Sequence, residues 1–225
     1  MGTKLRALDL FCGAGGATRG LQLAGFHVTG VDYETQPNYS GDHFVQANAF
    51  NRFDYESFDL VWASPPCQGR TAYKRRPNHV RDVDTDGAIA KTRALLRGSS
   101  TPYIIENVPG APLESPMTLC GSMFGLDVRR HRIFETSYDV GAQPSCRHYM
   151  QQGDFPQATN RANRRKTCEI GVWRIPLATQ RKAMEIDWME LEELSEAIPP
   201  AYSQFLAERW LASRARNADQ IRYAR

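Results

Sequence analysis

A cysteine that follows two prolines and precedes a basic segment is the residue of this sequence best suited to nucleophilic chemistry. Cys67 follows the proline pair of SPPCQ, and Arg70, Lys74 and Arg75 come after it. Prolines fix the backbone, and nearby positive charge favours the thiolate form of a cysteine. Taken alone, a free cysteine is more often a small buried residue. The neighbours of Cys67 shift the balance towards a reactive thiol.

A carboxylate further along the chain is a candidate partner for that thiol. Glu106 ends the apolar run Tyr103–Ile105 and opens the motif ENV. Most such residues merely mark the point where a strand meets water. A carboxyl group that faces a nucleophile can instead donate a proton or a hydrogen bond to the substrate.

Three arginines around a histidine form another candidate site. If the segment Arg129–Phe134 is extended, alternation places Arg130 and Arg132 on one side and Arg129 and His131 on the other. Two guanidinium groups on one face can hold a carboxylate or a phosphate. An ordinary charged edge strand is the competing interpretation.

A glycine-rich turn, DLFCGAGG at Asp9–Gly16, follows the first strand-like run. Glycine lets the backbone approach a ligand closely, and a helix that begins there favours a negative group. Asp32 ends the next strand-like run, where it can bind ribose hydroxyls. Many α/β folds use such a turn only for packing, but together the two features favour a nucleoside-bearing cofactor. The spacing is not the Gly-x-Gly-x-x-Gly of dinucleotide sites.

Short apolar runs alternate with helix-like stretches in the first half of the chain. This alternation predicts an α/β fold with a mostly parallel sheet, in which ligands bind beyond the carboxyl ends of the strands. FCGAGG, SPPCQ and ENVPG all fall at such ends. The predicted strands are Leu5–Phe11, Val28–Val31, His43–Gln46, Phe58–Ala63 and Pro102–Glu106, and the predicted helices are Thr18–Ala24 and Ala88–Leu96.

The second half is organised differently. Gln143–Gly171 is polar and lacks apolar periodicity, which predicts an irregular lobe. Helical patterns follow at Leu177–Met184 and Trp188–Ala197. A break at Pro199-Pro200 precedes a last helix, Ala201–Ala212, and we expect the polar tail beyond it to be frayed.

The order and spacing of DLFCGAGG, SPPCQ, ENV and RRHRIF resemble the cytosine-5 DNA methyltransferase family. The resemblance covers roughly Leu5–Phe134 and resumes near Ala197–Pro200. It implies an α/β, Rossmann-like S-adenosylmethionine-dependent methyltransferase fold with a small irregular recognition lobe. The implied division is a catalytic and cofactor-binding core at 1–138, a reduced target-recognition lobe at 139–172, and C-terminal helices returning to the core at 173–225.

The resemblance also implies roles for single residues. Cys67 matches the nucleophile that adds to a flipped-out cytosine, and Glu106 matches the residue that contacts the base. Arg130 and Arg132 complete the implied catalytic set. The implied ligands of S-adenosyl-L-methionine are Phe11, Gly13, Gly15, Gly16, Asp32, Asn48 and Pro65, and the implied DNA contacts are Gln68, Arg70, Lys74 and Arg75.

The sequence departs from the family pattern at several places. Val128 stands where the family has glutamine, and Ser195-Glu196 replaces the usual Gly-Asn. The recognition lobe is much shorter than in family members, which places sequence specificity in question more than catalysis.

The expected function is therefore that of a DNA (cytosine-5)-methyltransferase. A methyl group passes from S-adenosylmethionine to carbon 5 of cytosine in double-stranded DNA, through a covalent Cys67 adduct. Two alternatives stay open: a methyltransferase of the same family that acts on tRNA, and a non-catalytic DNA-binding relative. A redox role for Cys67 is disfavoured, because no second cysteine lies nearby in sequence. We expect a monomer, and no partner restriction enzyme is evident.

Composition is consistent with this function. The 225 residues, 41% of them hydrophobic, suit one well-buried domain. No apolar run is long enough to span a bilayer and no secretory signal is evident, so we expect no membrane partner and a cytoplasmic location in a prokaryotic or phage-infected cell. The net charge is only +3, but three basic clusters favour a polyanionic substrate.

The five cysteines are odd in number and widely spaced, which argues against a disulfide framework. Cys146, His148 and Cys168, with Cys120 or His131, could supply zinc ligands, but their spacing matches no compact ligand pattern. Ordinary residues of the small lobe are the favoured interpretation, so no metal is expected.

Overall fold

A computed structural model describes residues 4–66, 85–148, 151–152 and 165–223. Its centre is a seven-stranded sheet with the strand order β3-β2-β1-β4-β5-β7-β6. β1 to β5 are parallel, whereas β7 runs antiparallel to both of its neighbours, β5 and β6. The strands are β1 (Arg6–Leu10), β2 (His27–Asp32), β3 (His43–Gln46), β4 (Leu60–Ala63), β5 (Tyr103–Asn107), β6 (Met117–Leu119) and β7 (Arg132–Thr136).

The path of the chain through this sheet reverses at β1. From β1 the chain fills one side of the sheet with β2 and β3, and then crosses to the other side with β4 and β5. The neighbouring carboxyl ends of β1 and β4 therefore form the switch point at which open α/β sheets bind ligands. The glycine-rich turn follows β1 and the proline pair follows β4, so both candidate motifs lie at this point.

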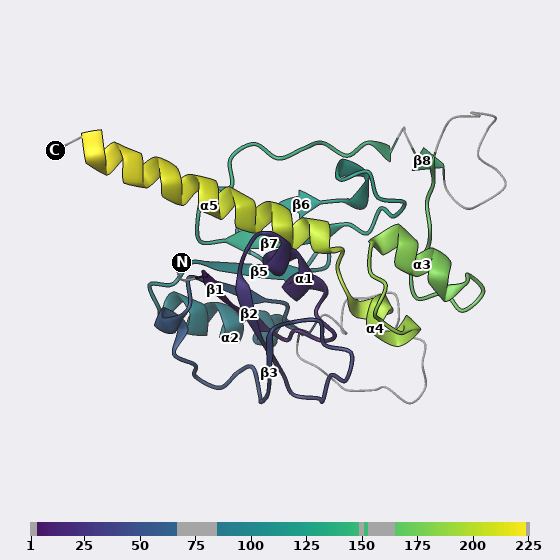
Figure 1. Cartoon of the computed structure of the whole chain (residues 1–225), viewed down its shortest axis with the longest axis horizontal. Coiled ribbons are helices and arrows are strands. Elements are labelled where there is room, and N and C mark those ends of the chain that lie inside the picture. Colours follow the sequence, from purple (N-terminus) through teal and green to yellow (C-terminus); the bar gives the residue numbers. More distant parts are fainter. Residues whose placement is uncertain (1–3, 67–84, 149–150, 153–164, 224–225) are drawn as a thin grey trace.

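Helices cover both faces of the sheet (Figure 1). α1 (Gly16–Leu23) and the long α5 (Pro200–Tyr223) pack together on one face, and α2 (Thr85–Arg97) covers the other. α3 (Leu177–Met184) and α4 (Leu191–Glu196) pack beside the glycine-rich turn. Single 3₁₀ turns occur at Tyr55–Ser57 and Gly121–Met123.

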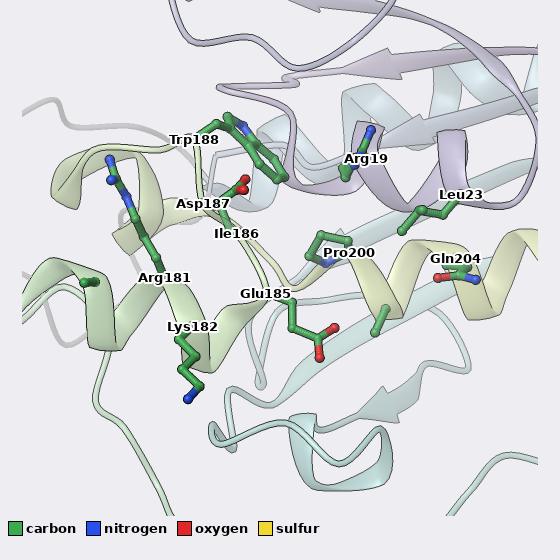
Figure 2. Close-up of a pocket in the computed structure, with 12 residues that line it drawn as sticks. Arg19, Leu23, Arg181, Lys182, Glu185, Ile186, Asp187, Trp188, Pro200 and Gln204 are labelled. Atoms are coloured by element: carbon green, nitrogen blue, oxygen red, sulfur yellow. The ribbon is translucent and has the colours of Figure 1, made fainter.

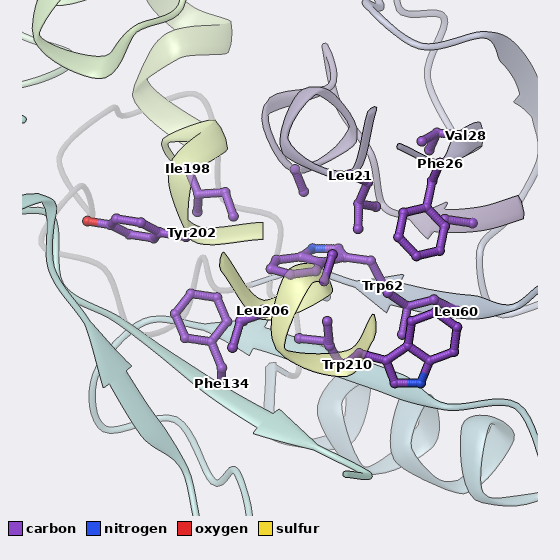
Figure 3. Packing of buried hydrophobic residues seen from close by; sticks show 14 of the residues in the cluster. Leu21, Phe26, Val28, Leu60, Trp62, Phe134, Ile198, Tyr202, Leu206 and Trp210 are labelled. Carbon is purple, nitrogen blue, oxygen red and sulfur yellow. The ribbon is translucent and has the colours of Figure 1, made fainter. Parts of the chain in front are cut away.

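Alternation along each strand builds two apolar layers. Leu60 and Trp62 face α1 and α5, whereas Val61 and Ala63 face α2. Figure 3 shows the first layer, in which Trp62 and the aromatic residues of α5 fill the space between the helices and the sheet. Both layers are closed to solvent, so the sheet is a rigid base for the residues at its carboxyl edge.

The last helix is longer than the sequence pattern predicts. It begins at Pro200, since proline suits the first turn of a helix, and it continues to Tyr223 instead of fraying after Ala212. Arg214 anchors this extension: its guanidinium lies over the Trp210 ring and 3.3 Å from an Asp59 carboxylate oxygen.

The polar segment before α3 is largely irregular where the structure describes it. Its regular part is a two-residue parallel pair, β8 (Gln151–Gln152) and β9 (Arg165–Lys166). The three-part division of the chain stays a prediction. Among the described residues, no helix combines the length and the apolarity that crossing a bilayer requires.

Candidate active site

The turn after β1 adopts left-handed backbone angles three times. Phe11 has a φ of 60°, Gly13 of 49° and Gly15 of 91°. A Cβ atom placed on Gly13 would meet no atom within 4 Å, so open space lies beside this residue. A Cβ atom on Gly15 would lie 2.6 Å from the Ser40 hydroxyl. Gly13 therefore borders a space that a ligand can enter, whereas Gly15 is required for packing.

The same turn is supported by the C-terminal part of the chain. A Cβ atom on Gly16 would lie 2.7 Å from the Ile198 carbonyl oxygen, so this glycine permits a close backbone contact. The Trp188 indole N–H donates a hydrogen bond to the Ala14 carbonyl at 2.9 Å. The shape of the turn thus depends on residues more than 170 positions later.

Asp32 points at this turn from the end of β2. Its Oδ2 accepts a hydrogen bond from the Gly13 N–H at 2.9 Å, and its Oδ1 accepts one from the Glu34 N–H at 3.1 Å. Each carboxylate oxygen has a second lone pair, so the group can still accept hydrogen bonds from sugar hydroxyls. The next residue, Tyr33, exposes 69% of its surface. An exposed aromatic ring beside this carboxylate suits a purine, and its position after the strand-ending acid was the available sequence signal.

Two more predicted cofactor residues are connected through one aromatic residue. Phe11 packs edge-on against Phe50, with the ring centroids 5.1 Å apart. Asn48 is exposed, and its side-chain oxygen accepts a hydrogen bond from the Phe50 N–H at 2.9 Å. Phe50, which the sequence reasoning did not single out, therefore connects Phe11 and Asn48.

A buried carboxyl group lies beneath the turn. Asp9 is fully buried in β1, and its Oδ2 accepts a 2.5 Å hydrogen bond from the Thr18 hydroxyl. Its Oδ1 has no hydrogen-bond partner among the described residues. Burial raises the pKa of Asp9 from 3.8 to about 7, and the charges of Asp32 and Glu106 act in the same direction, against the Thr18 bond. The sequence signal for a buried acid was the position of Asp9 inside the apolar run Leu5–Phe11.

Glu106 is the next-to-last residue of β5, and its carboxyl group is buried. Burial raises its pKa above the usual range, although Arg132, a hydrogen bond with Ser64 and the charge of Arg130 act in the opposite direction. The Arg132 Nε lies 3.2 Å from its Oε1. Arg132 and Ser64 thus hold the Glu106 carboxyl group in place, and its burial favours the protonated form.

The segment after β4 is fastened to Glu106 and its strand. The Trp62 indole N–H donates to the Ser64 hydroxyl oxygen at 2.9 Å, which leaves the Ser64 hydrogen for Glu106. The Asn107 amide donates to the Pro65 carbonyl at 3.0 Å. Pro65, predicted as a cofactor residue, is therefore held at the edge of β5.

The proposed nucleophile, Cys67, follows this segment directly in the sequence. Cys67 and the four predicted DNA contacts lie outside the described residues, and their roles stay predictions; the contacts are Gln68, Arg70, Lys74 and Arg75.

Alternation predicted that Arg130 and Arg132 lie on one side of a single extended segment, and this prediction is wrong. Arg130 has a φ of 37°, and β7 begins only at Arg132. The Arg130 Nε donates to the Ala197 carbonyl and its Nη2 to the Ser195 carbonyl, both at 2.6 Å. The Tyr202 hydroxyl donates to the Arg130 carbonyl at 2.9 Å. A left-handed residue turns the chain before the strand, so Arg132 pairs with the carboxylate while Arg130 fastens the segment before α5.

A surface cavity of about 670 Å³ lies elsewhere, among α1, α3 and the start of α5 (Figure 2). Arg181 and Lys182 come from α3, Arg19 comes from α1, and Glu185 and Asp187 come from the connection that follows α3. None of the residues at the carboxyl ends of the strands lines this cavity. It is separate from the candidate active site.

Comparison with known proteins identifies the fold. No protein-family model and no curated protein matches the chain. Among solved structures, the Entamoeba histolytica methyltransferase EhMeth aligns over 94% of this chain and 99% of its own, with 12% identity and a TM-score of 0.57. The strand order and this alignment show a Rossmann-like methyltransferase fold, and the predicted fold class is confirmed.

Two further structures align over smaller parts. A putative DNA modification methyltransferase encoded within an E. coli prophage is 22% identical over 58% of this chain and 45% of its own, with a TM-score of 0.46. The S. pombe Dnmt2 methyltransferase is 19% identical over 63% of this chain and 52% of its own, with a TM-score of 0.44. The aligned part of this chain spans about half the length of each.

Proposed function

We propose that this chain is an S-adenosylmethionine-dependent methyltransferase that modifies carbon 5 of cytosine in DNA, with Cys67 as its nucleophile. The observation that carries the proposal is Glu106, a buried carboxyl group with a raised pKa at the end of β5. It is held by Arg132 and Ser64, and the segment leading to Cys67 is fastened to the same strand end through Pro65.

The residues around the glycine-rich turn fit the cofactor. Gly13 borders open space, Asp32 keeps lone pairs for ribose hydroxyls, and Tyr33 offers an exposed ring to a purine. Phe11 and Asn48 border the same turn and strand edge. S-adenosylmethionine bound there supplies an electrophilic methyl group at the switch point of the sheet.

The chemistry needs both the thiol and the carboxyl group. Carbon 5 of cytosine is a weak nucleophile, and addition of the Cys67 thiolate to carbon 6 makes it an enamine carbon. Glu106 donates a proton to N3 as that bond forms, which avoids negative charge on the ring. Carbon 5 then takes the methyl group, loses its proton to a base, and the Cys67–carbon 6 bond breaks as N3 returns its proton. The net change is one methyl group gained and one proton released.

Arg132 has a defined task in this scheme. Its guanidinium lies 3.2 Å from the Glu106 carboxylate, so it holds that group in one orientation in both protonation states. Burial opposes ionisation of Glu106, and Arg132 limits that effect. The raised pKa favours the protonated form of Glu106, and the pairing with Arg132 still allows the proton to be transferred.

A direct assay tests the proposal. The full chain is incubated with labelled S-adenosylmethionine and either duplex DNA or tRNA, and the modified nucleoside is identified after digestion. We expect 5-methylcytosine in DNA, at least 10³-fold less product from Cys67→Ser, and a large loss from Glu106→Gln. DNA containing 5-fluorocytosine should trap a covalent adduct, because fluorine replaces the proton that must leave carbon 5 before Cys67 is released.

Other outcomes point elsewhere. Label in tRNA with none in DNA would replace the proposed substrate. DNA binding with no transfer to either nucleic acid would indicate a non-catalytic relative. Cys168 is half-buried among apolar residues around α3 and lies outside the glycine-rich turn, so Cys168→Ala serves as the thiol control, and an equal loss of product in that variant would show that the effect of Cys67→Ser is not specific.

A further inference from the structure

Four cysteine and histidine side chains converge beside the candidate active site, at the loop end of the β6–β7 hairpin. Cys120 directly follows β6, and His131 directly precedes β7. Cys146 and His148 come from the start of the polar segment. Their four candidate ligand atoms all lie within 4.8 Å of one another. Two strands and one loop thus bring together residues that are separated by up to 28 positions.

The spacing of these atoms is close to that of a tetrahedral metal site. The Cys120 Sγ lies 3.1 Å from the His148 Nε2, and the Cys146 Sγ lies 3.5 Å from the His131 Nε2. With metal–sulfur and metal–nitrogen bonds of the usual length, ligand atoms in a Cys₂His₂ zinc site lie about 3.4–3.8 Å apart. The two histidine rings are nearly perpendicular, at 87°, with centroids 4.9 Å apart. The ring planes therefore do not stack, and both Nε2 atoms are directed at sulfur atoms.

The surroundings are suited to a neutral metal complex. Cys120 is fully buried, while the other three side chains are half-buried. Two thiolates and two neutral imidazoles balance the charge of a divalent ion, so the complex carries no net charge into this environment.

A second layer of contacts orients one of the sulfur atoms. The Arg147 N–H donates to the Ser122 hydroxyl oxygen at 3.0 Å, and the Ser122 oxygen lies 3.2 Å from the Cys120 Sγ. The hydroxyl hydrogen is therefore available to the sulfur. A hydrogen bond of this kind stabilises a metal-bound thiolate.

We propose that Cys120, His131, Cys146 and His148 bind one structural zinc ion. Four protein ligands leave no open position, which is the arrangement of a structural and not a catalytic site. The ion would bind the first residues of the polar segment to the hairpin that carries Arg132. His131 lies directly before Arg132, so a bound ion would also hold in place the backbone that leads to the Arg132–Glu106 ion pair. This replaces the sequence-based expectation that no metal is bound.

The fifth candidate ligand from the sequence does not belong to this cluster. The Cys168 thiol donates to the Glu169 carbonyl at 3.4 Å, and Cys168 packs with the cluster of apolar residues around α3. It is a half-buried cysteine of the same region, and so it provides a matched control.

Elemental analysis of the purified full chain tests the proposal. We expect about one zinc per chain, and at least a tenfold lower content in Cys146→Ser and in His148→Asn. Cys168→Ser should keep the full content. Replacement of zinc by cobalt(II) should give the intense visible bands of a tetrahedral site and thiolate-to-metal charge transfer in the near ultraviolet.

A ligand exchange keeps the test valid if a variant folds poorly. Cys146→His should retain the metal and lose about half of the thiolate charge-transfer intensity. Zinc-free protein that fails to take up zinc against a chromophoric chelator would overturn the proposal. So would equal zinc loss in Cys168→Ser, or a Cys120–Cys146 disulfide found in protein purified under anaerobic, metal-replete conditions. None of these measurements depends on methyl transfer, so the two proposals fail separately.

Discussion

Asp9 makes the stability of this protein depend on pH in a direction opposite to that of most carboxylates. Its pKa is raised by burial to about 7 in the folded chain, against 3.8 when exposed. The folded state therefore binds a proton that the unfolded state releases between these two values. The stabilisation is fully present below pH 3.8 and is lost as the pH rises to about 7. Replacement by asparagine should remove this loss, because the amide cannot ionise.

The size of the effect follows from the two pKa values. A rise from 3.8 to about 7 corresponds to roughly 4 kcal/mol at 1.36 kcal/mol per pKa unit. At about pH 3, Asp9→Asn and the parent chain should be similarly stable, since Asp9 is then mostly protonated in both the folded and the unfolded state and both side chains accept the Thr18 hydrogen bond. At about pH 8 the variant should be the more stable, by up to roughly 4 kcal/mol. Urea unfolding at a series of pH values measures the difference.

The control is a carboxylate of the opposite kind. Burial acts against ionisation of Asp42, but hydrogen bonds from the Val28 N–H and the Gln22 amide lower its pKa below 3.8. Asp42→Asn should therefore reduce stability at neutral pH, and this reduction should disappear as the pH falls through the lowered pKa. Parallel stability curves for Asp9→Asn and the parent chain would refute the reasoning, because they would show that Asp9 is ionised in both states.

Three further substitutions test the site and its supports. Tyr33→Ala should weaken S-adenosylmethionine binding by about tenfold, by loss of stacking, while Tyr33→Phe should not; calorimetry measures both. Gly20→Ala should destabilise the fold by about 3 kcal/mol or more in urea unfolding, because its Cβ would overlap the Pro200 carbonyl, whereas Gly98→Ala should have a small effect. Arg132→Ala should remove about 3–5 kcal/mol of stability by leaving its carboxylate partner unpaired, and lysine at this position should restore part of it.

Much of the fold could be predicted from apolar periodicity. The strand His43–Gln46 and the helix Leu177–Met184 have the predicted bounds, and the other four predicted strands differ by one or two residues at their ends, whereas β6 was not predicted. Their signals are local, because a buried strand or helix face is visible in the order of its own residues. The placement of the chemistry-bearing motifs at strand ends followed from the same patterns.

The features that were missed depend on contacts between distant segments. The left-handed backbone of Arg130 is held by the Tyr202 hydroxyl and by hydrogen bonds to Ser195 and Ala197, none of which is near it in sequence. The length of the last helix depends in part on a contact between Arg214 and Asp59. Periodicity within one segment carries no information on either contact.

The group formed by Cys120, His131, Cys146 and His148 shows the same limit more clearly. Cys120 and His131 are brought together by the β6–β7 hairpin, and a separate loop adds Cys146 and His148. Sequence patterns for zinc rely on ligands a few residues apart. Only Cys146 and His148 lie that close in sequence, so the spacing of the four residues did not predict the cluster.

The packing of α5 on α1 also bears on how the chain folds during synthesis. Gly20 fits against Pro200 and Ser203, and Gly16 fits against Ile198, so the first helix and its turn are completed by residues that are synthesised about 180 positions later. Until the ribosome has released those residues, the apolar face of α1 and the sheet beneath it have no cover. Contacts of such long sequence separation slow folding and leave the nascent chain open to aggregation. Expression yield should therefore respond to chaperone supply more than the stability of the finished protein would suggest.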